Sequence, residues 1–310
     1  MLISFMNALP GALAQGIIWG IMAIGVYLTF RLLDIPDLTV DGSFTTGGAV
    51  AVMSIINGTD PWVSLIYAFI AGCIAGFVTG VLHTKFGIPA ILAGILTQLA
   101  LFSINLRILG DKSNQGLNMR KYNLVVVLND IQYTLIVASL FALVLIALLY
   151  WFFGTELGSS IRATGTNEAM AKANGINTNR NKIIGLALSN GIVALSGALY
   201  SQFNGNADVN SGRGAIVIGL AAVIIGEVLF SHFFNNFSLR LLGSVIGGML
   251  YYTAITFVLA LGLRTNDLKL FSAIVVALFL GAPYWKNKIT IRRIGRKTTS
   301  LHAREGKEDA

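Results

Sequence analysis

Three acidic residues lie close together between two apolar stretches. Asp34, Asp37 and Asp41 fall within eight residues, and Ser43 follows them. Pro36 interrupts any continuous helix here and favours an extended conformation for the preceding residue. Because ionisable groups next to apolar spans are costly, they usually serve a function. Two interpretations remain open: a broken helix that lines a transport path, or a cap that Asp41 provides for the helix it begins.

Neutral polar side chains also lie inside apolar stretches, where buried amides and hydroxyls need hydrogen-bond partners. They either line a path or join neighbouring helices. A further acid, Glu227, follows 13 uncharged residues. A charge at the bilayer centre costs at least about 2.5 kcal/mol, so we expect Glu227 near an interface, paired with His232 or Arg240. The candidate path residues are Asp41, Ser43, Thr46, Gln98, Asn105 and Asn190.

The polar stretch of residues 154–182 is the longest between two clear apolar spans. Asn167, or Thr166 before it, can cap a helix there, and Glu168 would face the positive end of the helix dipole. Lys172 stands four residues after Glu168, at the spacing of an ion pair on one face. The sequence predicts a two-turn helix over residues 167–174, with Gly165 and Gly175 at its ends. It is either a docking element for a partner or an ordinary loop.

The sequence lacks the spacing patterns of an enzyme site. His83, His232 and His302 are far apart and show no metal-ligand spacing. The phosphate-binding pattern G-x-x-x-x-G-K-[ST] is absent. We expect no catalytic residue, no metal and no cofactor, and any ATP hydrolysis would require a separate ATPase subunit.

Composition indicates a membrane protein. Of 310 residues, 55% are hydrophobic and 12% are charged, whereas soluble domains carry about 25% charged residues. Several uncharged runs approach or exceed the roughly 20 residues that cross a bilayer as a helix. The first charge, Arg31, follows the first run, so that run is read as a retained span rather than a cleavable signal. The net charge of +8 fits cytoplasmic enrichment in Lys and Arg, so no nucleic-acid partner is expected.

We expect these residues to be positioned by an all-α, polytopic membrane helical bundle of about nine transmembrane helices (8–10). The expected spans are residues 9–30, 42–56, 62–82, 89–109, 131–153, 183–202, 215–229, 241–261 and 270–284. The second is short and could be a broken or re-entrant helix. Close glycine pairs, such as Gly72 with Gly76 and Gly243 with Gly247, favour packing within one bundle over a dimer face.

If the C-terminal tail is cytoplasmic, the expected orientation of the chain in the membrane follows. Counting back from it places 15 of the 22 Lys and Arg residues inside and 7 outside, with the N-terminus outside. We expect residues 1–285 to form the transmembrane domain, with the loop 154–182 on the cytoplasmic side. Residues 286–310 would form a basic cytoplasmic tail.

One segment is similar to a known family. Residues 160–169 (SIRATGTNEA), followed by NGI at 174–176, resemble the cytoplasmic coupling segment of ABC importer permeases of the branched-chain amino acid and ribose type. The resemblance extends over residues 9–283. Residues 33–44 (LDIPDLTVDGSF), 94–97 (GILT) and 103–107 (SINLR) are similar to a subgroup associated with tryptophan or tyrosine uptake.

This resemblance implies a permease subunit of an ATP-dependent importer in the cell membrane, working with an ABC ATPase, an extracellular substrate-binding protein and a second permease, most simply as a homodimer. The cargo would be a small polar solute, first an amino acid, with a sugar or nucleoside as the alternative. A self-sufficient secondary transporter or channel is the competing hypothesis. The expected ATPase-coupling residues are Arg162, Gly165, Thr166, Asn167, Glu168, Ala169, Lys172, Gly175 and Ile176.

Overall fold

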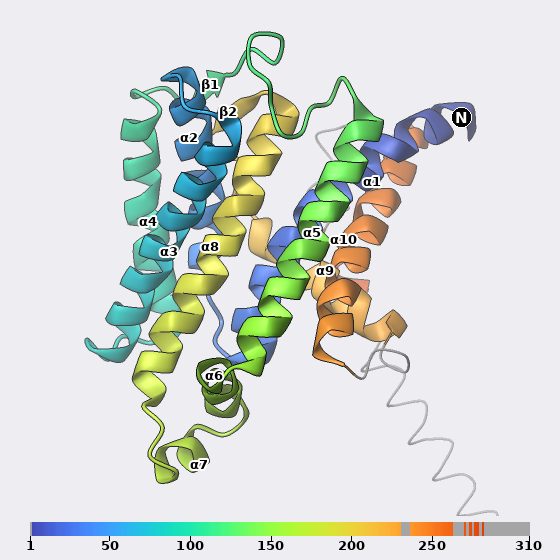
Figure 1. Cartoon of the computed structure of the whole chain (residues 1–310). Helices are drawn as coiled ribbons and strands as arrows, with labels where there is room; N and C mark the ends of the chain where they lie inside the picture. The colour runs from blue at the N-terminus through green and yellow to red at the C-terminus, as the bar shows by residue number, and fades with distance from the viewer. Residues whose placement is uncertain are drawn as a thin grey trace, which may run out of the picture.

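The computed structural model describes residues 2–230, 236–262, and 270, 273, 274, 276–278 and 281, and these form a helical bundle (Figure 1). The expected all-α bundle is therefore confirmed. A two-stranded antiparallel sheet joins β1 (Asn114–Gly116) to β2 (Asn206–Asp208) at one end. The helices are α1 Leu2–Tyr27, continued by the π-helix η1 Leu28–Leu32, α2 Thr39–Ile56, α3 Pro61–Thr84, α4 Ala90–Ile108, α5 Ile131–Gly154, α6 Glu156–Thr166, α7 Glu168–Ala173, α8 Thr178–Asn204, α9 Ala215–Phe230 and α10 Phe237–Ala260.

Six helices in the described part of the chain are long and apolar enough to cross a membrane: α1 with η1, α3, α4, α5, α8 and α10. The expected count of about nine is not confirmed. The expected spans 42–56 and 215–229 correspond to α2 and α9, which fall short of this criterion. The 16 residues of α9 would reach about 24 Å, less than the roughly 30 Å hydrocarbon core. Most of the expected span 270–284, and the tail 286–310, lie outside the described residues.

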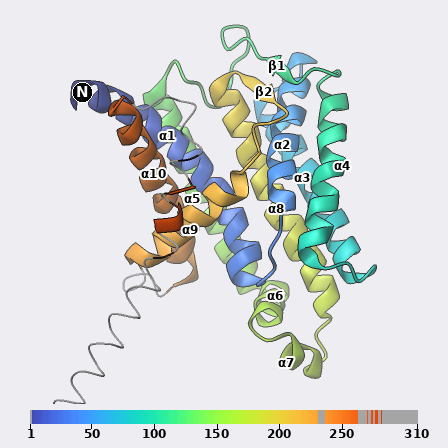
Figure 2. The same cartoon turned by 180° about the vertical axis from the view of Figure 1, so that it is seen from behind.

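An extended or irregular segment precedes each of these two helices (Figure 2). Residues 33–38 run from the end of η1 to the start of α2, with Asp34 in the left-handed region at φ 55°. At its start α2 lies beside the middle of α4, because the backbone of Gly42 packs against Gln98 and Leu101. Residues 205–214 lead from α8 to α9, whose first turn contacts Asp41. Residues 33–38 interrupt the helical path before α2, but α2 itself, with 18 residues, is longer than the expected span 42–56. A broken second crossing stays a prediction.

The core is built around α1 and α8, the most buried of the spans. Small residues let the neighbouring helices approach them closely. Gly72 and Gly76 of α3 face the backbone of α8, and Gly247 of α10 faces Ala222 of α9. The glycine pairs expected to pack within one bundle do so.

Charged residues gather at the two ends of the bundle. The ends of η1 and α3, the pair α6 and α7, and the start of α8 lie at one end, opposite the small sheet (Figure 1). The end with α6 and α7 is called the helical-loop end below, and the other the sheet end. Arg31 and Glu227 form an ion pair at the helical-loop end. Of the expected partners of Glu227, His232 lies outside the described residues and the pairing with Arg240 stays a prediction, whereas Arg31 was not expected.

Candidate functional site

Asp41 joins the two short helices in the middle of the bundle. Its carboxylate accepts hydrogen bonds from the backbone N–H groups of Gly214 and Ile216, each at 2.9 Å. The Thr45 hydroxyl accepts a third from Gly212 N–H at 3.1 Å. Gly212 and Gly214 lie in the turn before α9, and Ile216 lies in its first turn, where backbone N–H groups lack partners within the helix. Asp41 is therefore a cap for α9 and not for α2, in whose first turn it lies. We call this contact the half-helix junction.

A buried polar network fixes the extended segment to α8. Asn190 donates to Asp37 Oδ2 at 2.6 Å and accepts from the Ser43 hydroxyl at 2.6 Å. Asp37 Oδ1 accepts from Thr39 N–H at 2.9 Å. Because these groups satisfy one another, Ser43 and Asn190 join segments 33–38, α2 and α8 in this conformation. Thr46 is also buried and donates to Gly42 O at 2.9 Å.

Three threonine hydroxyls from three helices form a chain of hydrogen bonds, called the hydroxyl ladder here, which sequence reasoning missed. The Thr39 and Thr79 hydroxyls lie 2.7 Å apart, and Thr79 donates to Thr97 at 2.9 Å. These three threonines are buried on α2, α3 and α4. The ladder secures the first turn of α2 to the two helices that flank it.

The two remaining candidate path residues lie on α4. Gln98 is half-buried and packs against Gly42 beside the half-helix junction. Asn105 is buried, and its Oδ1 is one of two buried side-chain atoms in the described residues without a hydrogen-bond partner. An open acceptor of this kind is costly unless water or a ligand satisfies it.

Arg213, which precedes the start of α9, was also missed. It is exposed, and its guanidinium lies 5.6 Å from the centre of the Phe102 ring in the middle of α4. A cation is costly in contact with lipid tails. The face formed by Asp41, Arg213 and the middle of α4 is therefore a candidate for contact with water or another protein. The signal in the sequence was a lone basic residue directly before an apolar run.

Four aromatic rings from four helices meet on the sheet side of the junction. Trp19 of α1 stacks on Phe44 of α2 at 4.8 Å and on Tyr252 of α10 at 5.8 Å, and it meets Tyr200 of α8 edge-on at 5.5 Å. The Trp19 indole Nε1 is the second buried atom without a partner. We call these four residues the aromatic cluster. It offers an unused hydrogen-bond donor within an apolar, aromatic surrounding.

The helix expected at residues 167–174 is present as α7, Glu168–Ala173. The Asn167 side chain accepts from Met170 N–H at 3.0 Å, and Gly175 has φ 79°, with Ile176 N–H donating back to Ala171 O at 3.0 Å. Both expected caps are thus in place. Thr166 does not cap; its hydroxyl donates to Arg162 O.

A second helix, α6, precedes α7 and was not anticipated. Its cap, Thr155, and an acid in its first turn, Glu156, were available as sequence signals. Gly165 lies inside α6, so the expectation that it marks the start of α7 was wrong. A side chain there would strike the Leu32 carbonyl oxygen, which explains the glycine. Arg162 lies over the ring of Phe237 at 5.6 Å.

Glu168 ties α7 to α8. It pairs with Lys172 at 3.0 Å, as the spacing predicted, and also with Lys182 at 2.8 Å. The hydrogen bonds and charges of these lysines lower the pKa of Glu168 to about 2. Asn181 donates to Thr164 of α6 at 2.9 Å. The pair α6 and α7 is therefore held against the first turns of α8, while Ala169 and Met170 remain exposed.

Comparisons with known proteins agree on one family. Residues 9–283 match the family model described as branched-chain amino acid transport system / permease component. The chain is 42% identical over 275 residues to a tyrosine transport system permease protein of Clostridioides difficile (strain R20291), covering 89% of this chain and 91% of the relative. It is 30% identical over 210 residues to the autoinducer 2 import system permease protein LsrC of Yersinia pseudotuberculosis (strain IP 31758), covering 67% of this chain and 58% of that one.

Among solved structures, PsaBC from Streptococcus pneumoniae in complex with Fab superposes with a TM-score of 0.53 at 17% identity, covering 90% of this chain and 95% of that chain. This similarity concerns the fold alone. The match over residues 9–283, together with the 42% identity to a transport permease, shows that the chain belongs to the branched-chain amino acid transport system permease family and is a multi-pass membrane permease subunit of an ABC importer.

Proposed function

We propose that this permease imports a small polar solute using ATP hydrolysed by a separate ATPase subunit, which docks on α6 and α7. The observation that carries the proposal is the fixed position of α7 against α8. A docking element must transmit a movement, and Glu168 and Asn181 link this pair of short helices to α8 by an ion pair and a hydrogen bond. The exposed Ala169 and Met170 would form the contact surface, with Met170 63% exposed.

A single helix connects this docking surface with the centre of the bundle. The first turns of α8 hold Asn181 and Lys182, its middle holds Asn190 of the Asp37 network, and Tyr200 of the aromatic cluster lies near its end. A tilt of α8 imposed at α7 would therefore reach the extended segment before α2. Coupling in this account is a movement of one rigid helix, and the two broken crossings are the parts that respond.

The path itself would run along the face that exposes Arg213 and Asp41 near the middle of α4. A second copy of the chain, in a homodimer, would enclose this face and exclude lipid from it. The charges require water or protein opposite them. This arrangement differs from the initial set of path residues, since Ser43, Thr46 and Asn190 are buried within one chain.

The cargo is proposed to be an amino acid, delivered from outside by a substrate-binding protein. The 42% identical relative is named as a tyrosine permease. The aromatic cluster supports an aromatic amino acid, because its rings could stack on a similar ring and Trp19 Nε1 could donate to a polar group. A sugar or a nucleoside is the alternative.

The helical-loop end is proposed to be cytoplasmic, with the tail 286–310 on the same side of the cell membrane. This end carries more basic residues than the sheet end, in the pattern of cytoplasmic loops. Those in the described residues are Arg31, Lys85, Arg162, Lys172, Arg180, Lys182 and Arg240, against Arg107, Lys112, Arg120, Lys121 and Arg213 nearer the sheet end or in the centre.

Reconstitution into liposomes tests this function. The permease would be assembled with a candidate ABC ATPase and a candidate substrate-binding protein from the same organism, and uptake of labelled tyrosine, ribose and a nucleoside would be measured. We expect uptake that needs all three proteins and ATP. Uptake by the permease alone, driven by an ion gradient, would support the self-sufficient transporter and contradict the proposal.

A further inference from the structure

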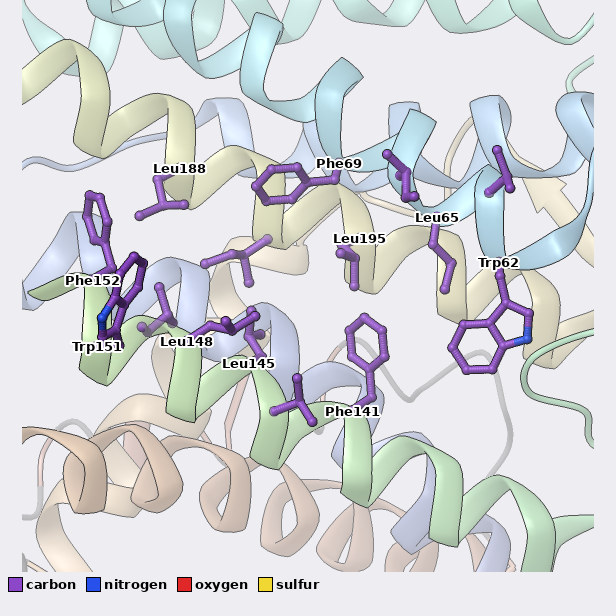
Figure 3. Close-up of a pocket in the computed structure, with 15 residues that line it drawn as sticks. Trp62, Leu65, Phe69, Phe141, Leu145, Leu148, Trp151, Phe152, Leu188 and Leu195 are labelled. Atoms are coloured by element: carbon purple, nitrogen blue, oxygen red, sulfur yellow. The ribbon is translucent and has the colours of Figure 1, made fainter.

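An apolar groove runs along the outside of the bundle between α3 and α5, with α8 as its floor (Figure 3). Its volume is about 600 Å³. Trp62, in the first turn of α3, and Trp151, in the last turn of α5, lie at its opposite ends, and Phe69, Leu188 and Leu195 lie between them. Since α3 and α5 are both spans, the groove follows the depth of the bilayer. Tryptophans at both ends match the two interfaces of a membrane.

A second hollow continues this groove toward the helical-loop end. It has a volume of about 690 Å³ and shares Phe69, Phe152 and Leu188 with the first. Its outer part is polar and basic, because Lys85 follows the end of α3 and Arg180 lies in the first turn of α8. The two hollows together form one groove, apolar along most of its length and cationic at one end. We call it the lateral groove.

The two cations at this end have no acidic partner among the described residues. Within the described part of the chain, neither Lys85 nor Arg180 forms an ion pair, whereas the neighbouring Lys172 and Lys182 both bind Glu168. Both residues are exposed. The hollow also presents the neutral polar side chains of Thr84, Asn177 and Asn179. An anion with hydrogen-bond acceptors would therefore find two cations and several polar groups in one place.

We propose that the lateral groove binds an anionic phospholipid. Its phosphate would contact Lys85 and Arg180, and its acyl chains would lie along Phe69, Phe152 and Leu188. Basic pockets between membrane helices on the cytoplasmic side have the chemistry that holds such head groups. A groove that is apolar along most of its length and cationic at one end matches this ligand better than two alternatives. A free phosphate would leave the apolar part empty, and an apolar partner helix would leave both cations without an anion. Placing the lipid in the cytoplasmic leaflet rests on the proposed orientation, but the binding itself does not.

Native mass spectrometry of the purified permease tests the site. Dioleoyl phosphatidylglycerol and dioleoyl phosphatidylcholine would be added in turn, so that the acyl chains match and only the head group differs. We expect the wild type to prefer the anionic lipid. The double variant Lys85→Gln/Arg180→Gln should lose roughly tenfold to thirtyfold of that preference, the size expected for two cations at an anionic surface. The matched control Arg120→Gln/Lys121→Gln, at the sheet end, should keep it.

A second variant tests the apolar part without changing charge. Leu188→Trp would fill the groove where its two hollows meet, and binding of both lipids should fall. Leu140→Trp, on the exposed face of α5, is its control. Equal binding of the two lipids by the wild type, or an unchanged preference in the Lys85/Arg180 variant, would overturn the proposal. So would a Leu188→Trp variant that dissociates a dimer yet binds lipid normally, because a second copy would then occupy the groove. None of these readouts depends on transport.

Discussion

Asp41 Oδ1 accepts a 2.9 Å hydrogen bond from Ile216 N–H, 175 residues further along the chain. One carboxylate at the start of α2 thereby caps α9. Two helices that are not among the six candidate spans of the described residues are joined near their N-termini inside the bundle. Because both N-termini carry partial positive charge, a carboxylate is the residue suited to this position.

The half-helix junction predicts a large effect for Asp41→Ala. Losing a cap typically costs about 0.5–2 kcal/mol, and here it also leaves N–H donors of α9 unsatisfied near the middle of the bundle. We expect a lower apparent Tm in detergent and a loss of transport. Asp60→Ala is the matched control, since Asp60 caps α3 at its exposed start. That control should lower the Tm slightly and leave transport intact; equal transport loss in both would argue against a special role for the junction.

The Asp37 network predicts an order of severity. Asn190→Leu removes the donor to Asp37 and the acceptor from Ser43, which leaves a buried carboxylate oxygen unpaired at a cost of about 1–3 kcal/mol. Ser43→Ala removes only the hydroxyl and should be milder. Thermal unfolding in detergent measures both. If Ser43→Ala proved the more damaging, Asn190 would not be the centre of the network.

The ion pairs of Glu168 predict a specific pH range. The pKa of Glu168 is lowered from 4.5 to about 2, so its charged form is favoured in the folded state. Its contribution is complete above about pH 4.5 and is lost as the pH falls toward 2. Because Glu168 is partly exposed, each pair contributes at most about 1 kcal/mol.

A spin label at Asn174 checks this prediction. Glu168→Gln should increase the label's mobility by the same amount at every pH from about 5 to 8, the range in which the wild-type carboxylate stays charged. A difference between wild type and variant that changed within this range would show that another group controls α7.

From the aromatic cluster we predict that Trp19→Phe impairs transport while leaving the thermal stability of the permease nearly unchanged. The substitution keeps an aromatic ring but removes Nε1, which has no partner within the described residues. Stability should change little, while the apparent KM for the cargo should rise if this N–H contacts it. A fall in Tm with an unchanged KM would assign the indole a packing role instead.

Local features of this structure could be read from the sequence, and distant contacts could not. Asn167, Glu168 and Gly175 define α7 through contacts within a few residues, so a cap and a turn signal were sufficient. Pro36 indicated the interruption of the helix before α2. The partner of Asp41 was not accessible in this way, because the start of α9 lies 175 residues further along the chain and meets Asp41 only through tertiary packing.

The partner of Glu227 illustrates the same limit. The sequence suggested His232 or Arg240 as its partner, and the structure adds Arg31, across a separation of 196 residues. Gly165 was misplaced for a related reason. Position 165 requires a glycine because any side chain there would clash with the Leu32 carbonyl oxygen of η1, and not because a helix ends there. In both cases tertiary packing, rather than local preference, determined the role of the residue.

The docking of an ATPase on α7 is the central claim, and the ratio of ATP hydrolysed to solute imported tests it most directly. In liposomes that hold permease, ATPase and binding protein, Ala169→Arg places a bulky charge on the exposed face of α7. We predict that import falls while ATP hydrolysis continues, so that the ratio rises several-fold. Ser113→Arg, at the sheet end, should match the wild type. A wild-type ratio in a folded Ala169→Arg variant would contradict the account.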